Sequence, residues 1–208
     1  MKSPLTVVEE GLPQGSSLSC MLFIVFLNRV SVTLDKHADK GLRHALFVDD
    51  MSIWATNANS GKITRAIQAG INAVKGHCKM YKLKLSAPKT VGMLFTRAKK
   101  NVPDVTVHVE DGKPLAWVES FKFLGVWISP DLRFKTHCRR VASAAAGVLG
   151  KIRQLDYEDC LTAKSIRKLV NTYVLSKMAF SYPILSFATN TELDCLVKVR
   201  DAASRLIV

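Results

Sequence analysis

Residues 45–55 decide how this chain folds, because they place two adjacent carboxylates between two apolar runs. The stretch is Ala45-Leu46-Phe47-Val48-Asp49-Asp50-Met51-Ser52-Ile53-Trp54-Ala55. It predicts a β-hairpin in which residues 46–48 pair antiparallel with residues 53–55. Asp49 and Asp50 then lie at the tight bend, at one end of a sheet. Carboxylates placed there suit Mg²⁺, which takes one or two of them from a protein and completes its shell with substrate phosphates and water.

Ordinary turn chemistry is the alternative for this pair, because Asp tolerates the left-handed conformation and bonds its own backbone. A second segment upstream favours a ligand site, and it consists of Gly11-Leu12-Pro13-Gln14-Gly15-Ser16-Ser17-Leu18-Ser19. Its Gly and Pro residues break regular structure, and Ser16 or Ser17 can cap a helix that continues through residues 18–32. The free N–H groups of a first helical turn favour anions such as phosphate. A surface loop followed by a capped core helix is the simpler reading of this segment.

Together the two segments resemble reverse transcriptases, specifically those of non-LTR (LINE-like) retrotransposons. In that family a Leu-Pro-Gln-Gly loop opens a helix beneath the incoming nucleotide and the template base, and an aromatic-x-Asp-Asp hairpin carries catalytic metal ligands. The matching residues are Leu12-Pro13-Gln14-Gly15 and Phe47-Val48-Asp49-Asp50, with Val where many members have Ala.

Two later segments extend the resemblance in the order that the family shows. Residues 83–90 resemble the helix-to-strand turn that ends in Lys-Thr, and Phe123-Leu124-Gly125-Val126 resembles the hairpin that grips the primer end. The Pro and the Ala before Lys89 depart mildly from the family pattern. Four motifs in order across residues 11–128 make the resemblance specific.

The resemblance implies roles for a small set of residues. Asp49 is the expected metal ligand, Asp50 is the supporting carboxylate, and Mg²⁺ or Mn²⁺ is the implied cofactor. Lys89 matches a position from which a cation can neutralise or protonate pyrophosphate, although a plain surface lysine fits there as well. The nucleotide and template pocket is assigned to Leu12, Pro13, Gln14, Gly15 and Ser16, and the primer grip to Phe123, Leu124 and Gly125. The scattered histidines receive no role.

The resemblance also implies a part of the domain that this chain does not carry. The family's palm begins with fingers and with a strand that bears a further metal-binding Asp, whereas residues 1–10 contain no Asp. Two-metal phosphoryl transfer needs carboxylates that clamp two cations roughly 3.5–4 Å apart. We therefore expect the C-terminal part of a reverse transcriptase domain, inactive without its missing N-terminal part as partner. A catalytically inactive nucleic-acid-binding remnant is the alternative function.

The charge of the chain favours a polyanionic partner. Thirty Lys and Arg against 17 Asp and Glu give a net charge of +13, which also occurs in ribosomal, chromatin and membrane-surface proteins. The implied partners are an RNA template, a DNA primer and deoxynucleoside triphosphates. Contacts with the nucleic-acid backbone are expected from a basic helix that contains Arg133, Lys135, Arg139 and Arg140. A solvated helix face is the alternative for this cluster.

Cysteine usage and hydropathy limit the class of protein. The five cysteines show no Cys-x-x-Cys spacing, so neither zinc nor a disulfide framework is predicted. The apolar run at residues 20–27 is shorter than the roughly 18–20 residues of a membrane span, and no signal peptide is apparent. We expect an intracellular protein, in the nucleus, the cytoplasm or both, with no membrane contact.

The predicted fold class is α+β. An incomplete polymerase palm, an antiparallel sheet with packed helices, is expected at residues 1–129, and an α-helical thumb-like unit at residues 130–208. Apolar residues between Ile63 and Tyr81 recur at helical spacing, and strands are predicted at residues 90–96, 105–109 and 121–129. Beyond Pro130 only helical periods occur, at residues 137–155, 161–173, 176–187 and 191–208.

Overall fold

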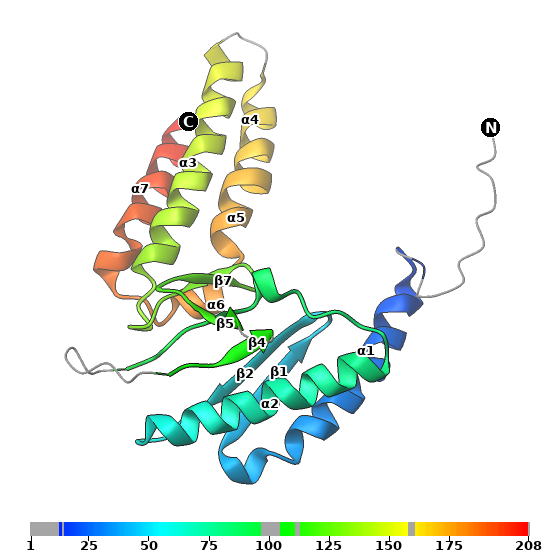
Figure 1. The fold of residues 1–208 in the computed structure, drawn as a ribbon. Coiled ribbons are helices and arrows are strands. Elements are labelled where there is room, and N and C mark those ends of the chain that lie inside the picture. Colours follow the sequence, from blue (N-terminus) through cyan, green and yellow to red (C-terminus); the bar gives the residue numbers. More distant parts are fainter. Residues whose placement is uncertain (1–12, 14, 97–104, 111–112, 158–160, 208) are drawn as a thin grey trace, which may run out of the picture. The chain divides into compact units, whose positions relative to one another are not determined.

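A computed structural model describes residue 13 and residues 15–96, 105–110, 113–157 and 161–207 (Figure 1). The chain divides into two compact units. The first comprises residues 1–91 and 101–116, and the second comprises residues 92–100 and 117–208. This division differs from the predicted boundary at residues 129 and 130, because the strands just before that boundary group with the helices that follow them.

The first unit is built on one hairpin and two long helices (Figure 1). Strand β1 (Leu42–Phe47) pairs antiparallel with β2 (Asp50–Ala55), and the hairpin packs with α1 (Ser17–Asp35) and α2 (Ser60–Met80). Four buried side chains from α1, β1 and α2 form the shared core, namely Val30, Leu34, Leu42 and Val74. The helical spacing read from the sequence therefore marks the buried face of α2.

Gly70 allows α2 to approach the hairpin closely. A Cβ atom at this position would lie 2.9 Å from Cδ2 of Leu42 and 3.5 Å from Cγ2 of Ile53. A distance below 3 Å between carbon atoms is far inside van der Waals contact. The absence of a side chain at residue 70 thus sets the distance between helix and hairpin.

A side chain of α2 also holds the strand β4 (His108–Glu110). The amide of Gln68 donates a hydrogen bond to the carbonyl of His108 at 3.0 Å and accepts one from its N–H at 2.8 Å. Buried and exposed residues alternate before and within this strand, with Val105, Val107 and Val109 buried. The alternation predicted for residues 105–109 is therefore present in the burial of the side chains, but the strand itself covers only residues 108–110.

The remaining elements before residue 118 are short. They are the 3₁₀ turns η1 (Ala38–Lys40) and η2 (Ala87–Lys89) and the strands β3 (Val91–Gly92), β5 (Lys113–Pro114) and β6 (Ala116–Trp117). The predicted strand at residues 90–96 is therefore only two residues long. In place of one larger sheet, the described strands form the two-stranded pairs β1–β2, β3–β6, β4–β5 and β7–β8.

The second unit joins a hairpin to a set of helices. Strand β7 (Phe121–Phe123) pairs antiparallel with β8 (Val126–Ile128). The helices are α3 (Lys135–Tyr157), α4 (Ala163–Leu169), the π-helical turn η3 (Val170–Leu175), α5 (Ser176–Ala179), α6 (Tyr182–Leu185) and α7 (Asn190–Ile207). The predicted helical region after Pro130 is confirmed, with α4, η3 and α5 following one another without a break. The mixture of helices and small two-stranded sheets is compatible with the predicted α+β class.

The core of this unit lies among α3, the α4–η3 run and α7, which Figure 1 shows side by side. It consists of the buried residues Ala145, Leu149, Ile152, Ile166, Val170, Val174 and Ala203. Small residues on α3 let the neighbouring helices approach, so the alanine-rich composition of this helix has a packing role.

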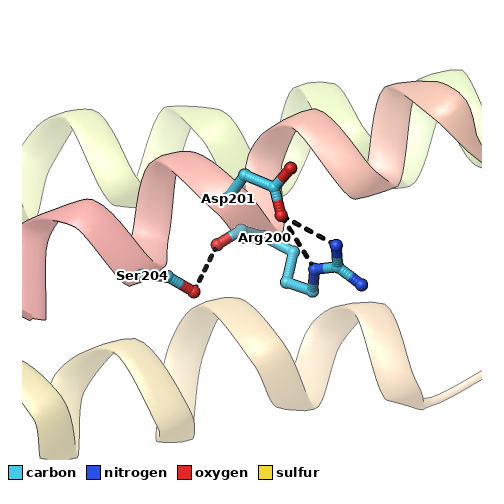
Figure 2. Close-up of polar contacts among 3 residues, drawn as sticks. All are labelled: Arg200, Asp201 and Ser204. Carbon is cyan, nitrogen blue, oxygen red and sulfur yellow. Dashed lines mark hydrogen bonds and ion pairs between the residues drawn. The ribbon is translucent and has the colours of Figure 1, made fainter.

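Two cations on α7 are paired with acids of the same helix. Arg200 donates hydrogen bonds from Nε and Nη2 to Oδ1 of Asp201 at 3.0 and 2.8 Å, and Oγ of Ser204 donates to the carbonyl of Arg200 at 3.1 Å (Figure 2). Lys198 pairs with Asp194 at 2.7 Å. These two cations therefore contribute less free positive charge than their number suggests.

Helix α1 is longer than the apolar run predicted. Its 19 residues are long and apolar enough to cross a membrane by length and composition, and only 11% of the apolar window is buried. The expected absence of a membrane span is therefore not supported by the length of this helix. The same helix supplies Val30 and Leu34 to the core of the first unit.

Candidate active site

The two adjacent carboxylates lie at the end of the β1–β2 hairpin, as the sequence predicts. Phe47 and Asp50 are the last cross-strand pair, so Val48 and Asp49 alone form the turn. The predicted register is wrong, because Leu46 pairs with Met51 and not with residues 53–55. The strands continue to a two-residue turn, which leaves no room for the longer bend that the prediction assumed.

The backbone of this turn is strained at Val48. Its φ is +53°, a left-handed value that is a genuine outlier for a β-branched side chain. Two-residue hairpin turns with a left-handed first central residue strongly favour Gly there. A non-glycine residue in this region costs about 1–3 kcal/mol, and such strain clusters at functional sites.

The carboxylates of Asp49 and Asp50 are both exposed. Across the described parts of the chain, no group of three or more His, Cys, Asp or Glu side chains is arranged to hold a metal. The pair therefore fits an ion that takes one or two carboxylates from the protein and its other ligands from phosphate and water, which is the usual behaviour of Mg²⁺.

A hollow of about 380 Å³ lies beside the turn, between α1 and β1. Its lining residues are Ile24, Leu27, Asn28, Ser31, His44, Ala45, Leu46, Phe47 and Val48. His44 is engaged within this wall, since its Nε2 lies 2.7 Å from Oγ of Ser31 and its Nδ1 lies 3.9 Å from a carboxylate oxygen of Asp35. The hollow is thus largely apolar and borders the strained turn.

The loop before α1 is only partly described, and Leu12 and Gln14 lie outside the described residues. Gly15 adopts φ +88°, a conformation that Gly adopts without steric cost. Ser16 occupies the N-cap position, but the predicted capping hydrogen bond from its side chain is absent. Instead, Oγ of Ser19 donates to the carbonyl of Pro13 at 2.7 Å. This bond folds the loop onto the first turn of the helix.

Lys89 ends the 3₁₀ turn η2 between α2 and β3. The predicted helix-to-strand turn is therefore confirmed, and Oγ1 of Thr90 closes it by donating to the carbonyl of Ser86 at 2.9 Å. Lys89 is exposed. Within the described part of the chain, no hydrogen bond or ion pair joins it to Asp49 or Asp50.

The predicted primer-grip residues form a hairpin in the second unit. Phe123 pairs with Val126, and Leu124 and Gly125 make the turn with φ of +46° and +86°. Two positive φ values are the signature of a type I′ turn. The predicted hairpin is confirmed, whereas the single strand predicted at residues 121–129 is wrong, because the turn divides this stretch into β7 and β8.

The predicted basic cluster is distributed over the start of α3 and the loop before it. Arg133 precedes the helix, contrary to the prediction, and Lys135 is its first residue. Arg139 and Arg140 are exposed. The guanidinium of Arg140 lies 3.7 Å from the centroid of the Trp127 ring, a cation–π contact. Arg140 is therefore held against β8.

Sequence reasoning missed a buried histidine that connects the hairpin to the helices. Nδ1 of His137 accepts a hydrogen bond from the N–H of Trp127 at 3.2 Å, so its Nε2 carries the proton and donates to Oγ of Ser181 at 2.7 Å. Burial lowers the pKa of His137, and the nearby charge of Lys122 lowers it further. The sequence signal that could have found His137 is its position beside the buried face of α3. An imidazole buried there needs hydrogen-bond partners.

Comparisons with known proteins agree with these features. The family described as reverse transcriptase (RNA-dependent DNA polymerase) matches residues 5–128. An RNA-directed DNA polymerase from the mobile element jockey of Drosophila funebris is 27% identical over 65% of this chain and 15% of its own length. A probable RNA-directed DNA polymerase from transposon BS of Drosophila melanogaster is 24% identical over 97% of this chain and 22% of its own length.

A third relative is a retrovirus-related Pol polyprotein from a type-1 retrotransposable element R1 of Nasonia vitripennis, 22% identical over 52% of this chain and 32% of its own length. The chain thus spans less than a third of each of these relatives. No solved structure matches. The match over residues 5–128 confirms the family that the four motifs indicated, and the chain belongs to the reverse transcriptase (RNA-dependent DNA polymerase) family.

Proposed function

We propose that this chain is part of a retrotransposon RNA-directed DNA polymerase and supplies the carboxylate hairpin, the nucleotide loop and the primer grip. The observation that carries the proposal is the exposed Asp49–Asp50 pair at a strained two-residue turn in a chain of the reverse transcriptase family. The first unit then corresponds to the C-terminal part of a palm, and the helices after Pro130 to a thumb-like unit.

Asp49 is the proposed metal ligand and Asp50 the supporting carboxylate. A bound Mg²⁺ or Mn²⁺ ion supplies activation of the primer 3′-hydroxyl and charge stabilisation of the leaving pyrophosphate. Asp49 lies in the turn, and Asp50 is the first residue of β2. The proposed principal ligand is therefore the residue at the tip of the hairpin. With such an ion bound, nucleotide phosphates and water would supply the ligands that these two carboxylates do not.

The proposed contacts with substrate come from both units. The nucleotide and template pocket is shaped by Leu12, Pro13, Gln14, Gly15 and Ser16. The side chain of Ser16 makes no capping hydrogen bond, so it does not occupy the first N–H groups of α1. Lys89 neutralises pyrophosphate as an exposed cation. Phe123, Leu124 and Gly125 hold the primer end, and Arg133, Lys135, Arg139 and Arg140 contact the phosphate backbone.

The proposed partners are an RNA template, a DNA primer and deoxynucleoside triphosphates, together with the N-terminal part of the domain, in an intracellular setting. A second candidate function is nucleic-acid binding without turnover. The observation that favours it is that the described residues offer this pair of carboxylates and no larger cluster. Two-metal chemistry needs a fuller clamp.

Paramagnetic Mn²⁺ tests the metal site directly. Titrated into ¹⁵N-labelled chain, Mn²⁺ should broaden the amide signals of residues 47–51 first, and Asp49→Asn should abolish this selectivity. Asp39→Asn is the matched control, because Asp39 is another exposed acid of the same unit and its loss should change nothing. Equal broadening around Asp39 and Asp49 would contradict the metal site.

Primer extension separates the two candidate functions. The purified chain is mixed with a DNA primer on an RNA template, Mg²⁺ and deoxynucleoside triphosphates. We expect duplex binding without extension for the chain alone. Extension that disappears in Asp49→Asn would show that no further carboxylate is needed, whereas duplex binding without selective Mn²⁺ binding would favour the second function.

A further inference from the structure

Phe180 lies against the turn of the β7–β8 hairpin and is nevertheless largely exposed. A Cβ atom at Gly125 would lie 2.5 Å from Cε1 of the Phe180 ring, so the ring contacts the backbone of the turn. The residue keeps 69% of its surface exposed. Gly125 is thus required for its positive φ and also for the space that the aromatic ring occupies.

The position of this ring is fixed by buried hydrogen bonds that begin at the next residue. Ser181 is only 2% exposed, and its Oγ accepts from Nε2 of His137 at 2.7 Å. Nδ1 of the same imidazole accepts from the N–H of Trp127 on β8. The hairpin that Phe180 touches is therefore tied, through one histidine, to the residue that follows Phe180.

Most of the Phe180 side chain is exposed to solvent, although one edge of its ring lies against the turn. An exposed aromatic ring supplies a flat apolar surface on which nucleic-acid bases stack, without regard to sequence. The same unit carries cations, with Lys122 exposed on β7, Lys177 exposed on α5, and Arg140 of α3 over the Trp127 ring. An exposed aromatic ring beside a hairpin, on a unit that also presents cations, is a combination that suits a nucleic-acid strand.

We propose that Phe180 is a nucleic-acid-binding residue that stacks on the terminal base of the strand held by the β7–β8 hairpin, and that the His137–Ser181 pair positions it. The proposal rests on the proposed function, since it names a further contact of the same grip. Phe180 is the binding residue, and His137 acts only through Ser181.

A fluorescent base analogue reports this stacking. A DNA primer with 2-aminopurine at its 3′ end is annealed to an RNA template and titrated with the full chain. Stacking on an aromatic ring should quench the 2-aminopurine, and Phe180→Trp should keep the quenching. Phe180→Ala should remove it and weaken binding by about 5- to 140-fold, the range measured for loss of one stacked base.

Two further variants separate stacking from folding. Phe180→Leu keeps an apolar side chain over Gly125 without an aromatic face, so it should fold and still lose the quenching. Phe187→Ala removes another exposed aromatic ring, 82% exposed, and should behave as the wild type. Ser181→Ala keeps Phe180 but removes the hydrogen-bond partner of His137 Nε2, so the ring should be held less firmly and the quenching should be reduced.

The outcomes distinguish the two proposals. If the wild type does not bind the duplex at all, the proposed function fails and the stacking role fails with it. If the wild type binds and Phe180→Leu keeps full quenching and affinity, the stacking role alone is wrong. If Phe187→Ala loses as much as Phe180→Leu, the effect belongs to general surface apolarity, which also overturns the assignment of Phe180.

Discussion

Phe47 and Asp50 are the last cross-strand pair of the β1–β2 hairpin, and they leave only Val48 and Asp49 in the turn. The two carboxylates therefore have different backbone settings, since Asp49 belongs to the turn and Asp50 to the strand. Val48, at φ +53°, accommodates the tight connection. This arrangement gives a structural reason for the unequal roles proposed for the two acids.

We expect Val48→Gly to stabilise the first unit. Glycine adopts a positive φ freely, which removes strain of about 1–3 kcal/mol, while its greater freedom in the unfolded chain costs about 0.5–1 kcal/mol. The free energy of unfolding, measured with urea, should therefore rise by up to about 2 kcal/mol. A clear loss of stability would mean that the packing of the half-buried Val48 side chain outweighs the strain.

Gly70→Ala should destabilise the same unit, because its Cβ would meet Leu42 at 2.9 Å. Overpacking of a core costs typically about 1–3 kcal/mol. Gly76→Ala is the matched control on the same helix, since a Cβ there meets nothing within 4 Å. Alanine is the better helix former by up to about 1 kcal/mol, so the control should be stabilised. Equal effects of the two substitutions in urea unfolding would contradict the close contact.

The sequence was sufficient for local features of this fold and insufficient for distant pairings. Alternating apolar residues marked the buried positions around β4, and the apolar-Asp-Asp-apolar pattern marked the hairpin turn. The partnership of His137 with Ser181, 44 residues apart, has no signal in a single sequence. The hydrogen bond from Trp127 to His137 joins the β7–β8 hairpin to the helices that follow it. From periodicity alone, the hairpin was assigned to the palm before residue 130.

Local reasoning also overestimated side-chain roles at the loop before α1. Ser16 or Ser17 was expected to cap the helix, yet the N-cap Ser16 makes no side-chain capping bond, and Oγ of Ser19 donates to the carbonyl of Pro13. Several hydroxyls in a row offer equivalent capping choices, and the structure of the loop decides among them. The position of Asp49 and Asp50 at a hairpin turn could be predicted from sequence because the two acids are adjacent, whereas contacts that join several elements could not.

Acidic pH should weaken the second unit through His137. Its pKa is lowered in the folded chain, mainly by burial, so the unfolded chain binds the proton more readily. The contribution of neutral His137 to the free energy of unfolding should be fully present above the pKa of histidine in the unfolded chain, about 6.5. It should be lost as the pH drops below that value toward the folded pKa. Protonation would also set two N–H donors facing one another at Nδ1 and the N–H of Trp127.

The pH effect is measured as the difference between the wild type and His137→Gln. Urea unfolding at several pH values between 5 and 8 should show a smaller acid-side loss in the variant. Another histidine with a lowered pKa is His77, where burial is the main cause and Arg29 adds to it. His77 contributes the same pH dependence of stability to the wild type and to His137→Gln, so its effect cancels in the comparison. Parallel pH profiles would contradict the role of His137.

Reversing the charges of Arg139 and Arg140 tests whether the start of α3 contacts nucleic acid. Each phosphate contact releases counterions, so the affinity for an RNA–DNA duplex should fall steeply with salt. Arg139→Glu/Arg140→Glu should weaken binding and flatten the slope of log affinity against log salt by up to about 2. The double variant Lys198→Glu/Arg200→Glu changes the net charge equally, but those cations are paired with Asp194 and Asp201. We therefore expect this control to have the smaller effect, and equal effects would show that only net charge matters.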